Sequence, residues 1–163
     1  MEPLIVLILV TLALRGVGAA RASALASWPV ALRGGLAAMF TLTGIVHFVG
    51  MRAEMVAMVP PFLPAPELLV TITGVLELAG AVGLLLRPTA RTAAGCLTVL
   101  LVVMFPANVH AALSEVATAP WDTLVPRTLM QIVFLAATLA VTACPATQRL
   151  LDRRRPATTG TGH

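Results

Sequence analysis

The chain has 163 residues, of which 58% are hydrophobic and 11% are charged, and its mean hydropathy is +0.94. Ordinary soluble domains carry about a quarter charged residues, so this composition excludes a soluble fold and indicates an integral membrane protein. The net charge of +4 comes from arginines spread along the chain with only 4% aromatic residues, a pattern that argues against a nucleic-acid-binding surface.

Apolar stretches long enough to cross a bilayer recur along the chain. A transmembrane helix needs about 20 mainly apolar residues. The predicted spans are residues 3–20, 29–49, 67–86, 91–113 and 124–143. We therefore expect an all-α fold, with one transmembrane helical bundle over residues 1–148 and a disordered cytoplasmic tail at 149–163.

The first span is short and has an alternative interpretation. The stretch from Leu4 to Leu14 is free of charge, and Ala20-Arg21-Ala22 resembles the cleavage site of a signal peptide. However, Glu2 precedes the apolar run and no basic residue does, so the positive region that opens a signal peptide is missing. We expect a retained helix, which gives five spans instead of four.

Prolines are expected to mark the ends of some of the later spans. Pro29 follows Trp28 at the start of the second span, and Pro145 is expected to stop the fifth. The connection at 50–66 is rich in proline and apolar residues, which suits a segment at the bilayer surface that caps the bundle.

The arginines predict the orientation of the spans. With five spans, one side of the membrane receives Arg15, Arg21, Arg33, Arg87, Arg91, Arg149, Arg153, Arg154 and Arg155, and the other side receives only Arg52 and Arg127. Because cytoplasmic loops carry the excess of basic residues, the N-terminus is expected outside and the C-terminus inside. With four spans, the arginines would no longer be divided nine to two between the two sides.

Glu77 is the most informative polar residue within the spans. It lies ten residues after Glu67, which places it about 15 Å along the helix and near the bilayer midplane. A carboxyl group there must be protonated or hydrogen-bonded to neighbouring helices. Thr73, Gly74, Gly80 and Ala81 lie on its face and allow close helix packing, so this face should point into the bundle. The residue either fixes packing or handles a proton or ligand.

Other polar residues are expected in the outer half of the bilayer: His47, Asn108, His110, Arg127 and Gln131. Asn108 and His110 are two positions apart and cannot share a helix face, whereas Arg127 and Gln131 can. Pro106 should kink its helix and leave the carbonyl of Val102 free. With Glu77, these residues are our candidates for an outward-opening polar pocket, although an ion pair of Arg127 with Glu67, Glu115 or Asp122 would explain that arginine structurally.

The two cysteines, Cys96 and Cys144, have neither C-x-x-C spacing nor a histidine at metal-like spacing. We therefore expect inert helix residues and no metal site.

Four strings in this order resemble the DoxX family of small bacterial membrane proteins: Gly44-Ile45-Val46-His47-Phe48, Met58-Val59-Pro60-Pro61, Thr73-Gly74-Val75-Leu76-Glu77-Leu78-Ala79-Gly80-Ala81 and Phe105-Pro106-Ala107-Asn108-Val109-His110. The likeness covers residues 33–143. It implies a four-helix core, to which the first span is an addition, in the bacterial cytoplasmic membrane. It also implies an association with soluble redox enzymes or with quinone chemistry in some relatives.

Three functions remain open at this point. The first is a non-catalytic accessory or scaffold subunit that binds membrane lipid and a partner protein. The second is a quinone-linked oxidoreductase subunit in which His47 and Arg127 bind the ring and Glu77 relays a proton. The third is a small-molecule carrier, which the lack of a detectable inverted repeat disfavours.

Overall fold

The computed structural model describes residues 2–113 and 123–154, with side chains described up to residue 143. All the regular structure in this part of the chain is helical, as expected. The elements are α1 (Glu2–Ala20), a short 3-10 turn η1 (Ala24–Ala26), α2 (Trp28–Val46), α3 (Arg52–Met58), α4 (Pro66–Leu85), α5 (Ala90–Leu113) and α6 (Leu124–Arg154).

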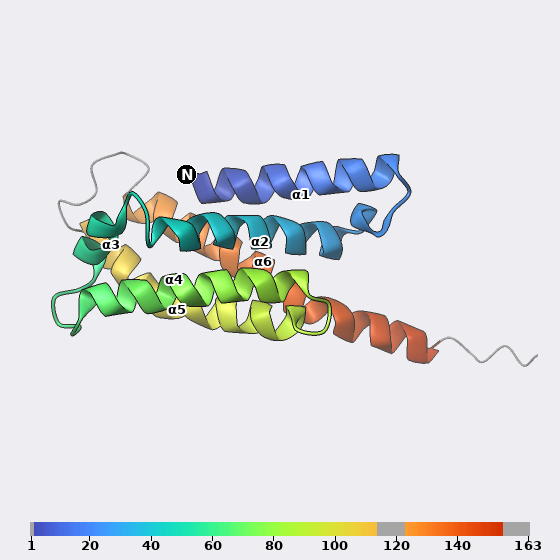
Figure 1. Ribbon diagram of the computed structural model, residues 1–163. Helices are drawn as coiled ribbons and strands as arrows, with labels where there is room; N and C mark the ends of the chain where they lie inside the picture. The colour runs from blue at the N-terminus through green and yellow to red at the C-terminus, as the bar shows by residue number, and fades with distance from the viewer. Residues whose placement is uncertain (1, 114–122, 155–163) are drawn as a thin grey trace, which may run out of the picture.

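Five of these helices are long and apolar enough to cross a membrane: α1, α2, α4, α5 and residues 124–143 of α6. They coincide with the five predicted spans to within a few residues. Successive long helices run in opposite directions, so that α3 and the beginning of α4 lie at one end of the bundle and the α4–α5 turn lies at the other (Figure 1).

Two boundaries differ from the prediction. Helix α2 ends at Val46, three residues early, and the connection that follows contains the unforeseen helix α3. Helix α6 continues through Pro145 to Arg154, so this proline does not stop it. Proline removes one backbone hydrogen bond but can be accommodated in a long helix by a bend. Residues 155–163 of the expected tail lie outside the described residues.

The helices pack as a four-membered core with one helix added. Helix α2 packs against α4, α4 against α5, α5 against α6, and α6 against α2, while α1 packs mainly on α2 and lies on the outside of the bundle (Figure 1). The core between the four helices includes Leu36, Phe40, Leu84 and Leu97, all of which are buried. This arrangement matches the expected core of four helices with an additional first helix.

Helix α1 is fitted closely to α2. A Cβ atom at Gly35 would lie 2.8 Å from the Leu7 carbonyl oxygen and would overlap the hydroxyl of Thr11. At the other end of α1, Arg15 lies 4.0 Å from the ring centroid of Trp28 and donates a hydrogen bond to the Ala26 carbonyl. These contacts hold α1 as an integral part of the bundle.

Candidate functional site

Glu77 lies on the inward face of α4, as the sequence predicts. The residue is only 4% exposed, and Gly74 and Ala81 on the same face are also buried. Gly80 faces α5 instead, because a Cβ there would lie 2.5 Å from the side chain of Leu97. The small residues around Glu77 therefore serve two different helix contacts.

Helices α2 and α4 approach closely beside this carboxyl group. A Cβ atom at Gly74 would lie 2.6 Å from Cβ of His47, and one at Gly44 would lie 2.8 Å from the side chain of Leu78. Since Gly74 lies about 12 Å along α4 from its first residue, α2 ends well inside the length of α4. His47, the residue that caps α2, is consequently carried into the interior and is 4% exposed.

His47 and Glu77 form a buried pair. Nδ1 of His47 lies 4.0 Å from Oε2 of Glu77 and 2.8 Å from the carbonyl oxygen of Thr43. Because a carbonyl only accepts, Nδ1 carries the hydrogen and donates it to Thr43. Oε2 of Glu77 is buried and has no hydrogen-bond partner. This oxygen is the clearest unsatisfied polar group at the site.

Arg52 at the start of α3 completes this end of the bundle, and the sequence analysis did not identify it as a site residue. Its guanidinium donates to the His47 carbonyl at 3.1 Å, to the Glu67 carbonyl at 3.2 Å and to the Thr71 hydroxyl at 2.9 Å. It thereby ties the end of α2 to the first turns of α4. The only sequence signal was that Arg52 is one of two arginines expected on that side of the membrane.

The remaining candidates belong to α5 and α6. Arg127 donates a hydrogen bond to Oδ1 of Asn108 at 3.3 Å, and Gln131 donates one to the Leu101 carbonyl at 2.7 Å. Pro106 was expected to free the Val102 carbonyl, but Gln131 bonds to the carbonyl of the preceding residue, Leu101. Two of the predicted acidic partners of Arg127, Glu115 and Asp122, lie outside the described residues.

His110 contacts a different neighbour from Asn108, as their spacing predicts. Its Nδ1 lies 3.2 Å from the Met58 carbonyl at the end of α3, whereas Asn108 faces α6. Helix α3 packs against α4 and α5 at this end, which is the capping position expected for the 50–66 connection. The six candidates thus form two groups, one between α2 and α4 and one around α5.

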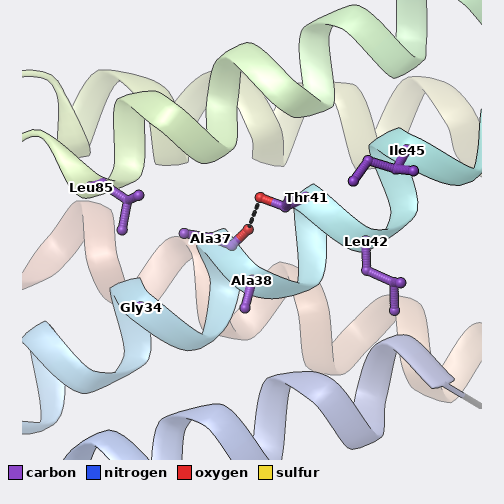
Figure 2. Close-up of a pocket in the computed structure, with 7 residues that line it drawn as sticks. All are labelled: Gly34, Ala37, Ala38, Thr41, Leu42, Ile45 and Leu85. Carbon is purple, nitrogen blue, oxygen red and sulfur yellow. Dashed lines mark hydrogen bonds between the residues drawn. The ribbon is translucent and has the colours of Figure 1, made fainter.

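Two surface hollows lie away from both groups. One is a groove of about 480 Å³ lined by six residues of α2 between Gly34 and Ile45, together with Leu85 of α4. Figure 2 shows that α2 runs between α4 and α1 at this groove. The other, of about 400 Å³, lies between α4 and α5 and includes Cys96. Neither is lined by any of the six candidates.

The side chains described for residues 2–113 and 123–143 contain no group of three or more His, Cys, Asp or Glu that could hold a metal ion. Cys96 is a free and exposed thiol. The chemistry available at the candidate site is therefore that of a buried carboxyl group beside an imidazole, with arginine and amide donors on the neighbouring helices.

Comparison with known proteins gives one result. A family model described as a domain of unknown function (DUF8561) matches residues 36–144, which includes most of α2 and all of α3, α4 and α5 but leaves out α1. No curated protein and no solved structure matches the chain.

Proposed function

The chain belongs to this DUF8561 family, and from its own geometry we propose that it is a multi-pass protein of the bacterial cytoplasmic membrane that acts as a non-catalytic accessory or scaffold subunit. The resemblance to the DoxX family is part of this proposal. We also propose the partner that this resemblance implies, which is a soluble redox enzyme or another membrane subunit.

Exposed apolar side chains support membrane insertion. Large hydrophobic residues are exposed on the outer faces of the long helices, among them Leu9 at 61%, Val103 at 66% and Leu129 at 58%. Monomeric soluble proteins rarely expose contiguous apolar surface on this scale. Lipid would cover these faces at no cost, because acyl chains are as apolar as the side chains.

The positions of the arginines support the proposed orientation. Arg21 and Arg87 lie at the end of the bundle formed by the α1–α2 and α4–α5 connections, whereas Glu54 and Glu67 lie at the opposite end with α3. The positive-inside rule makes the arginine-rich end cytoplasmic. The N-terminus is then outside and α6 leads to a cytoplasmic C-terminus.

The scaffold function rests on one observation, namely that four of the six polar candidates (Asn108, His110, Arg127 and Gln131) bond to neighbouring helices. Arg127 reaches Asn108, Gln131 reaches the backbone of α5, and His110 reaches the backbone of α3. Hydrogen bonds of this kind hold transmembrane helices together. These groups stabilise a rigid bundle, and its outward faces are free to bind lipid and a partner.

The unpartnered Oε2 of Glu77 favours the second candidate function, a quinone-linked oxidoreductase subunit. A buried carboxyl group beside an imidazole is a suitable proton acceptor, and buried ionisable groups within a membrane are often functional. In the scaffold interpretation, the Glu77 carboxyl has only a structural role in the packing of α2 against α4.

Equilibrium titration of the purified protein with a short-chain ubiquinone distinguishes these functions. The scaffold proposal expects no saturable binding, and it expects Glu77→Met to raise the unfolding free energy by about 1 kcal/mol because a buried carboxyl with one unpartnered oxygen is removed. Glu54→Met, at an exposed position on α3, is the control and should change neither quantity. Saturable binding that is lost in Glu77→Gln but kept in Glu54→Gln would replace the scaffold proposal with the quinone-linked function.

A further inference from the structure

The groove over α2 has the length of one lipid leaflet. Its lining on α2 runs from Gly34 to Ile45, eleven residues apart, which corresponds to about 16 Å along the helix. Half of a bilayer's hydrocarbon core is about 15 Å thick. Its lining includes the small side chains of Ala37 and Ala38, and the Thr41 hydroxyl is bonded to the Ala37 carbonyl and so presents little polarity (Figure 2).

One end of this groove is cationic. Arg33, which precedes Gly34, donates to the Leu84 carbonyl at 2.9 and 2.8 Å and to the Leu85 carbonyl at 3.2 Å, so its guanidinium is held at the end of α4. Leu85 lines the same end of the groove. Arg87, two residues after Leu85, is exposed, and its charge is near enough to repel that of Arg33.

No described carboxylate offsets these two charges. Among the acidic residues whose side chains the structure describes, Glu2, Glu54 and Glu67 belong to the opposite end of the bundle and Glu77 lies midway along α4. Two like charges at one place, with the apolar groove leading away from them, are complementary to an anionic head group that carries an acyl chain.

We propose that this groove binds an anionic phospholipid, with one acyl chain along α2 from Gly34 to Ile45 and the phosphate between Arg33 and Arg87. The proposal depends on the membrane location argued above and adds a ligand to it. Basic sites between helices on the cytoplasmic side select anionic head groups in this way. A zwitterionic lipid would fit the groove equally well, but its own cation would weaken the attraction to the arginine pair.

Native mass spectrometry of the full-length protein in a neutral detergent tests the site. Phosphatidylglycerol should form a one-to-one adduct with at least a fivefold lower Kd than phosphatidylcholine of the same chains. Arg87→Gln should weaken phosphatidylglycerol binding about fivefold, the effect of one basic residue near a lipid head group, and weaken phosphatidylcholine binding less. Arg21→Gln removes an exposed charge at the same end of the bundle and should have no effect.

A second variant tests the groove separately from the charge. Thr41→Phe fills the groove from an exposed position, so folding should be retained, and it should weaken binding of both lipids. Glycerol phosphate, which lacks acyl chains, should not form the adduct. Equal affinity for the two lipids would overturn the proposal. So would an unchanged Kd for phosphatidylglycerol in Arg87→Gln or in Thr41→Phe. The scaffold function is tested by the quinone titration, so its failure would be seen independently.

Discussion

Replacing Gly74 by alanine is expected to lower the free energy of unfolding by about 2 kcal/mol, the usual cost of forcing an extra carbon into a closely packed interior. The new Cβ would lie 2.6 Å from Cβ of His47 and 3.0 Å from the ring of Phe48. Cβ is fixed to the backbone and cannot rotate away, so α2 and α4 must separate. Unfolding by sodium dodecyl sulfate, followed by circular dichroism of the purified protein, measures the change.

Gly16→Ala is the matched control for this substitution. Gly16 also lies within a long helix, but a Cβ there would meet nothing within 4 Å. Its substitution should leave the unfolding free energy unchanged or slightly raised, because alanine favours helix more than glycine does. If Gly74→Ala were as stable as Gly16→Ala, the close approach of α2 and α4 beside Glu77 would be wrong.

Replacing Arg52 by methionine is also expected to lower the free energy of unfolding substantially. The substitution removes hydrogen bonds to the His47 and Glu67 carbonyls and to the Thr71 hydroxyl. Bonds from charged donors contribute about 1.5 to 3 kcal/mol each, but the site is partly exposed and Thr71 keeps its bond to Glu67, so about 2 kcal/mol in total is expected. The same unfolding titration measures this change.

Arg21→Met provides the comparison for Arg52→Met. Arg21 is exposed in the α1–α2 connection, so losing its charge should change the unfolding free energy by less than about 0.5 kcal/mol. A loss in Arg52→Met no greater than that in Arg21→Met would show that Arg52 does not tie α2 to α4.

The number and approximate positions of the long helices could be predicted from the sequence because each depends on a continuous apolar run, although the ends of α2 and α6 differ from the prediction. The inward direction of Glu77 could also be predicted, since Gly74 and Ala81 mark the packed face of its helix. Likewise, the spacing of Asn108 and His110 required them to face different neighbours. Each of these features is set within one segment of the chain.

Features that depend on two segments could not be predicted in this way. The early end of α2 places His47 beside Gly74, and only the packing of α2 on α4 reveals that contact. The role of Arg52 depends on α3 bringing its side chain to the first turns of α4. The continuation of α6 through Pro145 also differs from the prediction, because proline lowers the stability of a helix interior without always ending the helix.

The central claim is that the helices cross a membrane with the arginine-rich end of the bundle in the cytoplasm. Labelling of single cysteines with a membrane-impermeant maleimide in intact cells tests it most directly, after Cys96 and Cys144 are replaced by alanine. A cysteine at Glu54 should react in intact cells, whereas cysteines at Arg21 and Arg87 should react only after the membrane is permeabilised. Labelling of all three from the same side, or of Arg21 and Arg87 but not Glu54 in intact cells, would contradict the account.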